Sequence, residues 1–263
     1  MSSGDQHYNV EGILRLCANV FSAERGFELY PFKIGWYNDL VAAPFRFDCS
    51  PDTLCVLVIS SPHMFERSFK PWLLDSYQEI SAEHLDSMVV DPLDQFMKAE
   101  MHKLVQHLSS AGVSSFQPIH DFELWPSRRP KILMQTCGHV AGAAYYYQPT
   151  ELIDSLCANK QQNGKKKFLG LSLHPRYGGW FAYRAVIKFS DTQVPHLQKR
   201  QPAKLLHSSD EVVEALTKFN FHWRDWQYRD VVPVEAKYSQ DQQEYFGTMP
   251  KHRWTLILKW LNT

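Results

Sequence analysis

Apolar side chains recur along this chain in two patterns, one typical of helices and the other of strands. Near the start, apolar residues follow each other at three- and four-residue spacing, at Val10, Ile13, Leu14, Cys17, Val20 and Phe21. This spacing predicts an amphipathic helix that ends at Gly26. The run TLCVLVISS, which begins at Thr53, is short and almost wholly apolar, as expected of a buried strand.

Capping residues mark the starts of further helices. Asp91 followed by Pro92 predicts a helix start, because aspartate caps the first turn and proline suits the first helical position. The buried stripe of that helix is expected at Leu93, Phe96, Met97, Leu104 and Leu108. Ser208 and Glu211 have the spacing of a capping box, and Ser239 and Pro250 mark two more starts.

The stretch TCGHVAGAAYYYQ, residues 136–148, places small residues before three consecutive tyrosines. Pro130 predicts a helix that would include this stretch in its middle and end. In a helix, neighbouring side chains point about 100° apart, so the tyrosines would fan around the axis. Gly138 and Gly142 indicate close approach to the backbone, either by another helix or by a bulky planar ligand.

FLGLSL, HPRYGG and WFAYRAVIKF, from residue 168, are predicted to form a strand, a turn and a second strand as a hairpin. Alternation in the second strand places Trp180, Ala182, Arg184 and Val186 on one face. Arg184 is then a charge among apolar neighbours, which requires either a carboxylate partner or a position at a pocket. Helices interleaved with short strands indicate an α+β fold with a mainly antiparallel sheet, in a single domain over residues 1–263.

Composition restricts the functional classes. The chain has 263 residues, and its 28 basic and 28 acidic side chains cancel, so we expect no binding to nucleic acid or to a membrane. The basic run Lys165 to Lys167 is interpreted as an exposed turn. Five cysteines without CxxC spacing argue against disulfides and zinc, and we expect no protein-bound metal. With no signal-peptide pattern and no long apolar stretch, a cytoplasmic location is expected.

FNFHWRDWQYRD, residues 219–230, combines aromatic rings with two arginines and two aspartates. Phe219, Phe221 and Trp223 are interpreted as core residues. Arg224 and Arg229 need separate partners, and Asp225 or Asp230 is expected to supply one of them. With Arg184 and Arg253, these arginines would suit a small ligand that carries carboxylates.

RRPKILMQTCGHVAGAAYYYQ, HPRYGGWFAYR and FNFHWRDWQYRD, in this order and spacing, resemble the CblC family of cobalamin-processing proteins. The resemblance extends to GFELYPFKIGWYN and SSPHMFERSFKPWL, and so covers nearly the whole chain. It implies a fold related to flavin-dependent nitroreductases. It also implies base-off binding of cobalamin, reductive decyanation of cyanocobalamin, and dealkylation of alkylcobalamins by transfer to glutathione.

The resemblance also implies the site residues. Glutathione binding and thiolate stabilisation correspond to Arg184, Arg229 and Arg253. Contacts with cobalamin, or with FMN or FAD, correspond to Asp121, Ile132, Leu133, Met134, Gln135, His139, Tyr146, Tyr147, Gln148, Ser172 and Tyr183. The chain departs from the family pattern at Cys137-Gly138, where two alanines are usual, and at Ser172, where cysteine is usual.

Partners are implied by the resemblance as well: a CblD-type protein and methionine synthase, with the chain as a monomer or a ligand-induced homodimer. Two other functions stay open at this point. One is a flavin-dependent reductase of the nitroreductase type, which would carry bound FMN. The other is a carrier that acts as a chaperone for cobalamin without altering it, and such a carrier would need no arginine cluster.

Overall fold

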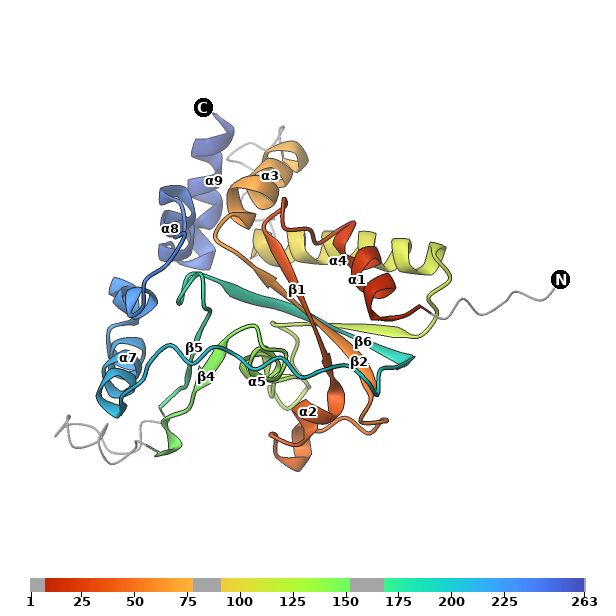
Figure 1. Ribbon diagram of the computed structural model, residues 1–263. Coiled ribbons are helices and arrows are strands. Elements are labelled where there is room, and N and C mark those ends of the chain that lie inside the picture. Colours follow the sequence, from red (N-terminus) through yellow and green to blue (C-terminus); the bar gives the residue numbers. More distant parts are fainter. Residues whose placement is uncertain (1–7, 78–90, 152–167, 263) are drawn as a thin grey trace.

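A four-stranded antiparallel sheet forms the centre of the computed structural model, which describes residues 8–77, 91–151 and 168–262 (Figure 1). Its strands are β1 (Phe27–Lys33), β2 (Thr53–Ser60), β3 (Phe116–His120) and β6 (Ala182–Gln193), in the order β1-β2-β6-β3. A separate antiparallel pair consists of β4 (Tyr145–Tyr147) and β5 (Leu171–Leu173). The predicted α+β class with a mainly antiparallel sheet is confirmed.

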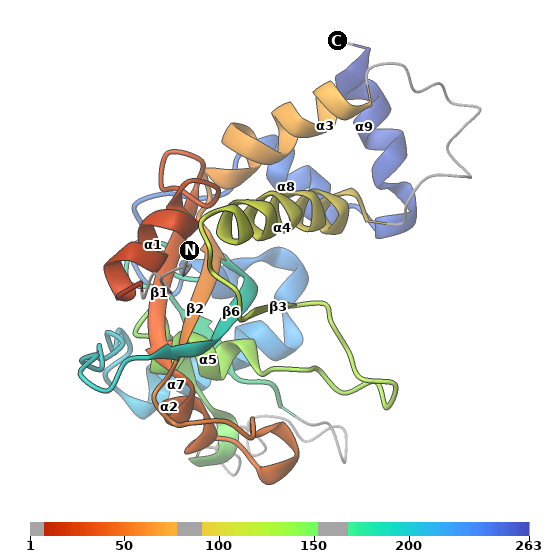
Figure 2. The same ribbon diagram turned by 90° about the vertical axis from the view of Figure 1, so that its right-hand side faces the viewer.

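Helices cover both faces of the central sheet. They are α1 (Val10–Ala18), α2 (Ile34–Asn38), α3 (Lys70–Ser76), α4 (Pro92–Ser110), α5 (Met134–Val140), α7 (Ser209–Phe221), α8 (Gln240–Gly247) and α9 (Arg253–Leu261). In Figures 1 and 2, α1 and α4 lie on one face of the sheet, and α5 lies on the other. None of the helices in the described ranges is long and apolar enough to cross a membrane.

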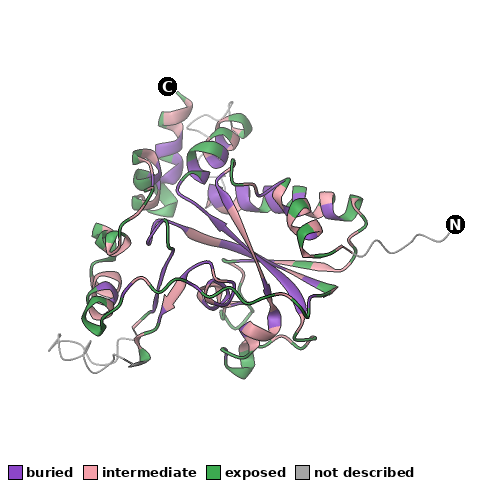
Figure 3. Cartoon of the chain, viewed as in Figure 1, coloured by how far each residue is buried: buried purple, intermediate pink, exposed green. Residues whose placement is uncertain are grey.

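Strand β2 lies between two layers of the hydrophobic core, and every one of its residues is buried (Figure 3). Leu54, Val56 and Val58 pack with side chains of α1 and α4, whereas Cys55, Leu57 and Ile59 belong to a second cluster with α5. Alternate residues of a strand point to opposite faces, so one apolar run serves both layers. The predicted buried strand at Thr53 is confirmed.

The predicted helix starts are also found. The side chain of Asp91 accepts a hydrogen bond from Leu93 N at the start of α4, whose expected buried stripe is buried throughout. Ser208 and Glu211 form the capping box of α7, and the side chain of Ser239 caps α8. A 3-10 turn at Pro250–His252 leads into α9.

Four details of the local predictions are wrong. Helix α1 ends at Ala18, and Gly26 instead forms a left-handed turn with φ of 84° against Met64. Helix α5 begins at Met134 and ends at Val140, so Tyr145–Tyr147 lie in a strand. The expected hairpin at 168–189 does not form, because β5 pairs with β4 while β6 pairs with β2 and β3. Trp180 precedes β6 rather than sharing a face with it. The run Lys165 to Lys167 lies outside the described residues.

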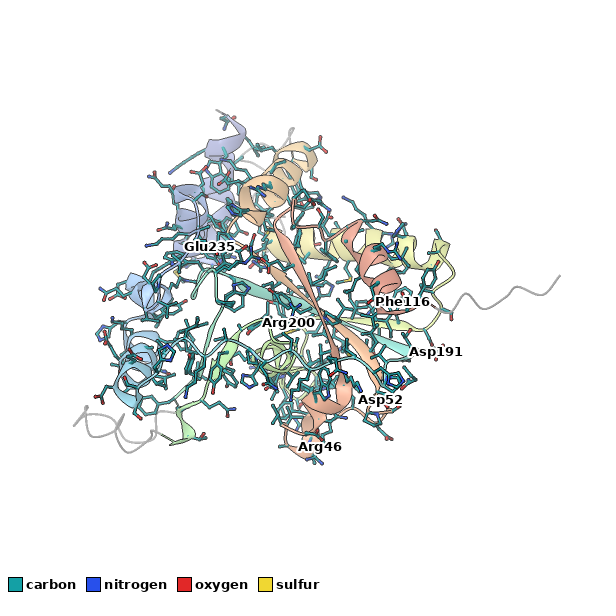
Figure 4. The ribbon with its side chains drawn as sticks, viewed as in Figure 1. Arg46, Asp52, Phe116, Asp191, Arg200 and Glu235 are labelled. Atoms are coloured by element: carbon teal, nitrogen blue, oxygen red, sulfur yellow. The ribbon has the colours of Figure 1, made fainter. Side chains whose placement is uncertain are left out.

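Gly138 and Gly142 are each closely approached by other parts of the described chain. A Cβ on Gly138 would lie 2.2 Å from the hydroxyl of Tyr183, a residue of β6. A Cβ on Gly142, whose φ is 75°, would lie 2.7 Å from the backbone oxygen of Arg200. Arg200 belongs to the extended segment between β6 and α7, which crosses in front of α5 (Figures 1 and 4). Among the described residues these neighbours are a strand and an extended segment rather than another helix, and the approach of a ligand stays a prediction.

Candidate functional site

Arg184, Arg224, Arg229 and Arg253 line one cavity of about 720 Å³ between β6, α9 and the chain that joins α7 to α8. The other described lining residues are Phe181, Ala182, Trp223, Trp226, Tyr228, Tyr238, Phe246, Gly247, Thr248, Met249 and Pro250. Among these described lining residues there is no carboxylate. A wall with four cations and no anion suits an anionic ligand. We call this space the arginine cavity.

Arg184 enters the arginine cavity from the start of β6. A register shift between Val58 and Ile59 leaves it without a Cα partner in β2. Its side chain is buried, and its Nε donates to Ser60 Oγ at 2.8 Å. Its Nη2 is buried and has no hydrogen-bond partner, and no carboxylate of the described chain lies within ion-pair distance. A buried cation without a partner is costly, so a ligand oxygen here would supply the missing interaction.

Arg229 is held mainly by aromatic rings. Its guanidinium lies 5.5 Å from the ring centre of Trp180, 4.9 Å from Trp226, 5.1 Å from Tyr228 and 5.0 Å from Tyr238. Nη1 donates to the carbonyl of Gly179, and Nε is buried without a hydrogen-bond partner in the described part of the chain. Cation–π contacts fix the position of the group without neutralising its charge.

The expected pairing of these arginines with Asp225 or Asp230 is wrong. Asp230 accepts instead from Trp180 Nε1 at 2.6 Å and from Lys237 Nζ at 3.0 Å. No ion pair joins Asp225 to an arginine within the described residues. Trp223 is likewise not a core residue, because it is 56% exposed and lies at the wall of the arginine cavity.

Arg253 differs from Arg184 and Arg229 because it forms an ion pair with a carboxylate. Its Nη1 lies 2.6 Å from Oδ2 of Asp91, which also caps α4 and accepts a hydrogen bond from Tyr245. Within the described ranges its buried Nε has no hydrogen-bond partner and is available to a ligand. The ion pair joins α9 to the start of α4. Arg253 therefore contributes more to the stability of the fold than Arg184 or Arg229, and less uncompensated positive charge to the cavity.

Asp94 adjusts the field around Arg184. Burial raises the pKa of Asp94 to about 6, and the carboxylates of Asp91 and Asp121 add to the rise while Arg184 opposes it. Asp94 therefore loses its negative charge as the pH falls below about 6. The net positive potential near Arg184 is expected to increase in that range, which favours an anionic ligand.

A second cavity of about 470 Å³ lies beside β4 and the start of α7, and we call it the tyrosine cavity. It is lined by four of the predicted contact residues, His139, Tyr146, Tyr147 and Gln148, together with Tyr145, Thr150, Lys204, Leu206, His207, Ser208, Ser209 and Val212. The hydroxyl of Tyr147 accepts the backbone N–H groups of Leu205 and Leu206, each at 2.8 Å. Tyr147 is thus tied into the structure, whereas Tyr146 and Gln148 keep free polar ends.

His139 contacts the same strand through its ring. Its Nδ1 accepts the N–H of Tyr146 at 3.2 Å, so the neutral ring carries its proton on Nε2. Burial and the nearby Lys199 lower the pKa of His139. A neutral imidazole donor is therefore present at this edge of the tyrosine cavity at neutral pH.

Ser172 and Tyr183 form a buried polar spot close to α5. Ser172 lies opposite Tyr146 in the β4–β5 pair, and the ring of Tyr183 contacts that of Phe181 with centres 5.1 Å apart. The hydroxyl of Ser172 interacts with that of Tyr183 and opposes the rise in the Tyr183 pKa that burial causes, and neither hydroxyl has another hydrogen-bond partner among the described residues. Buried hydroxyls with so few partners are uncommon, so both are candidates to bind a ligand. Because Phe181 lines the arginine cavity, this spot adjoins it.

The remaining predicted contact residues line neither cavity. Asp121 is exposed at the end of β3, and its N–H donates to the carbonyl of Arg184 at 3.1 Å. Gln135 donates to the carbonyl of Gly170 at 2.8 Å, which joins the start of α5 to β5. Ile132, Leu133 and Met134 lead into α5, with Ile132 buried in the core. No three metal-binding side chains lie together in the described ranges.

Sequence reasoning missed Trp226, Tyr238, Phe246 and Asp91 as components of the arginine cavity or of its support. Trp226 belongs to the aromatic and charged stretch 219–230 that the sequence analysis singled out, and its left-handed φ of 64° indicates a constrained turn. Tyr238 and Phe246 gave no local signal, and Asp91 was predicted only as a helix cap, because all three reach the arginines only through tertiary packing.

The fold and its cavities define an α+β protein with one cavity lined by arginines and another lined by tyrosines. Residues 26–257 match the model of the methylmalonic aciduria and homocystinuria type C family. The chain belongs to this family.

Relatives of known function support the assignment. A cyanocobalamin reductase / alkylcobalamin dealkylase of Danio rerio is 42% identical over 253 residues, which cover 95% of this chain and 94% of the relative. The Homo sapiens protein of the same name is 39% identical over 88% of this chain and 76% of its own length. The crystal structure of a Caenorhabditis elegans B12-trafficking protein, CblC, superposes with a TM-score of 0.85 at 36% identity and covers 95% of this chain and 96% of that one.

Proposed function

We propose that this chain is a cyanocobalamin reductase and alkylcobalamin dealkylase. It binds cobalamin with the lower-axial base displaced, removes cyanide by reduction, and transfers alkyl groups to glutathione. The names of the relatives support cobalamin as the substrate. The observation that carries the glutathione part is the arginine cavity, where Arg184, Arg229 and Arg253 each keep a buried N–H group that has no partner among the described residues.

Glutathione offers what the arginine cavity requires, since it carries two carboxylates and a thiol. Arg184 and Arg229 bind the carboxylates and thereby fix the position of the sulfur. A cation that lowers the thiol pKa by about one unit stabilises the thiolate by roughly 1.4 kcal/mol, which near neutrality increases its population up to about tenfold. The nucleophile is the thiolate, so this effect acts directly on rate.

In the dealkylation step, the thiolate attacks the cobalt-bound carbon of the substrate. A carbon–sulfur bond forms and the cobalt–carbon bond breaks, with its electron pair left on cobalt; the thiol proton has already passed to solvent. The cysteines buried in the core do not suit the role of nucleophile, because burial raises the pKa of Cys17, Cys55 and Cys137. Such thiols stay protonated at neutral pH and are poor nucleophiles.

In decyanation, electrons from a thiol or from a reduced flavin weaken the bond between cobalt and cyanide, which then departs. Displacement of the lower-axial base makes the metal easier to reduce. Its cost can be offset by binding energy spread over the corrin. For both reactions the protein contributes position and electrostatics, and the substrate carries the cobalt chemistry.

The proposed corrin contacts are His139, Tyr146, Tyr147, Gln148, Ser172 and Tyr183, with Asp121, Ile132, Leu133, Met134 and Gln135 at the periphery. Free polar ends at Tyr146 and Gln148 support this assignment, because the corrin rim is rich in amides. The hydroxyls of Ser172 and Tyr183 support it too, since among the described residues each has no hydrogen-bond partner but the other. Tyr147 acts mainly by holding the segment at Leu205 and Leu206.

A resident flavin fits the described residues poorly. The start of α7 borders the tyrosine cavity and would be the natural seat for a flavin phosphate. There, however, the first turn carries the carboxylates of Asp210 and Glu211, which would repel a phosphate, and the side chain of Ser208 already accepts the N–H of Glu211. We therefore propose that FMN or FAD acts as an electron donor that exchanges with solution.

The resemblance supports further proposals. They are a fold related to flavin-dependent nitroreductases, one domain over residues 1–263, and a cytoplasmic location. A CblD-type protein and methionine synthase are the proposed partners, with a monomer that forms a homodimer when ligand binds.

Anaerobic incubation of the purified protein with methylcobalamin and glutathione tests the proposed function. We expect mass spectrometry to detect S-methylglutathione in an amount equal to the methylcobalamin lost, well above a mixture without protein. Bound but intact methylcobalamin at saturating glutathione would instead identify a carrier.

A further inference from the structure

Glu28, a carboxylate of β1, lies outside the arginine cavity but is the centre of a hydrogen-bonded cluster. Its Oε1 accepts from Arg176 Nη2 at 2.5 Å and from the hydroxyl of Tyr177 at 2.8 Å. Its Oε2 accepts from the hydroxyl of Tyr30 at 2.5 Å. Burial raises the pKa of Glu28, but the bonds from His174, Tyr30 and Tyr177 outweigh it and lower the pKa to about 2. Glu28 is therefore ionised at every pH at which the protein functions.

His174 completes this cluster from the end of β5. It is fully buried, and its Nδ1 accepts the N–H of Arg176 at 3.1 Å. Nε2 lies 3.1 Å from the hydroxyl of Tyr30 and 3.6 Å from Glu28. The ring stacks on that of Tyr177, with centres 4.6 Å apart. Glu28 and His174 together fix the turn 174–179 against β1.

The same turn holds Arg229. Two hydrogen bonds, of 2.9 and 2.8 Å, join His174 to Gly178 and close the turn. Gly179 N donates to the carbonyl of Arg229 at 3.1 Å, and Arg229 Nη1 donates to the carbonyl of Gly179. A Cβ on Gly179 would lie 2.8 Å from the Cα of Arg229, so turn and arginine touch backbone to backbone. A shift of the turn must therefore move Arg229.

We propose that Glu28 is a positioning residue for Arg229, which it reaches through the turn 174–179, and so for the anionic ligand of the arginine cavity. This inference rests on the proposed function. Arg229 has no carboxylate of its own within the described residues, so its guanidinium depends on the turn and the surrounding rings for its place. Loss of the Glu28 bonds releases the turn without removing a group that touches the ligand.

Two variants test this relay with methylcobalamin and glutathione: Glu28→Gln, which removes the charge, and Tyr177→Phe, which removes one hydrogen bond and keeps the stacked ring. We expect the KM for glutathione to rise about tenfold in Glu28→Gln and less in Tyr177→Phe, with kcat and methylcobalamin affinity little changed. The double variant Glu28→Gln/Arg229→Ala is expected to be no worse than Arg229→Ala, because both changes act on one group.

Glu235→Gln is the matched control. Glu235, labelled in Figure 4, lies next to the turn, with its N–H donating to the carbonyl of Arg176 at 2.8 Å, but its side chain is exposed and outside the cluster. The KM of Glu235→Gln for glutathione should equal that of the parent protein. Thermal unfolding of each variant shows whether a change reflects global instability.

The outcomes separate this inference from the proposed function. If Arg229→Ala impairs glutathione use while Glu28→Gln and Tyr177→Phe leave the KM unchanged, the relay is wrong and the proposed function stands. Additive losses in the double variant would also overturn the relay, because Glu28 would then act independently of Arg229. If Arg229→Ala itself leaves glutathione use unchanged, the assignment of the arginine cavity fails first.

Discussion

Arg229→Ala is expected to lose about 100-fold in kcat/KM for glutathione in methylcobalamin dealkylation while it binds cobalamin as the parent protein does. The reason is that a hydrogen bond to a charged group contributes roughly 1.5–3 kcal/mol, and tenfold in rate corresponds to about 1.4 kcal/mol. The charge of Arg229 is not compensated within the described residues, because its neighbours are aromatic rings and a carbonyl rather than a carboxylate. The measurement is the initial rate of dealkylation across glutathione concentrations.

Arg184→Ala should act in the same direction, because Arg184 also has no carboxylate partner in the described chain. Arg253→Ala should lower stability more and glutathione use less, since it breaks the ion pair with Asp91. Arg46→Ala is the control: Arg46 is exposed and lies near α2, at the opposite end of the molecule from α8 and α9 (Figure 4). Parental rates at subsaturating glutathione in both Arg184→Ala and Arg229→Ala would contradict the assignment.

Glu100→Ala is expected to lower the free energy of unfolding by about 2–3 kcal/mol. Glu100 is fully buried on α4, with Arg25 Nη1 at 2.5 Å and Lys103 Nζ at 2.7 Å. Breaking a fully buried ion pair costs about 3–5 kcal/mol, but Arg25 is one-third exposed and can turn to water. Chemical denaturation measures the change, and Glu244→Ala, at an exposed position of α8, should leave stability nearly unchanged.

The same carboxylate predicts how stability depends on pH. Burial raises the pKa of Glu100, but the bonds from Arg25 and Lys103 outweigh it, so the pKa is lowered. A lowered pKa in the folded state contributes stability above the unfolded pKa of about 4.3, and this stability is lost as the pH falls further. The stability difference between parent protein and Glu100→Ala should therefore shrink below about pH 4. A difference that stays constant through this range would contradict the role of the charge.

The sequence predicted local structure well where short-range chemistry determines it. Asp91, Ser208 and Ser239 cap helices through neighbouring N–H groups, and β2 needs only an apolar run. It failed at residues 136–148, because a left-handed turn at Gly142 ends the helix and the tyrosines pair with β5. It failed again at HPRYGG, where a turn between two strands joins two different sheets rather than one hairpin.

The candidate site was likewise predictable only in part. Arg184 was marked by its position in an apolar strand, and Arg229 by the aromatic cluster around it, before the structure placed both at one cavity. Their partners could not be predicted, because Asp230 binds Trp180 and Lys237, and Ser60 contacts Arg184 only through the pairing of β2 with β6. The contact of Tyr183 with Gly138 likewise depends on packing between α5 and β6.

Titration of the protein with methylcobalamin, followed by visible absorption, tests the central claim most directly. Displacement of the lower-axial base changes the cobalt chromophore, so we predict a saturable shift of the spectrum toward that of the base-off form. A spectrum that remains that of free methylcobalamin at excess protein would contradict the account.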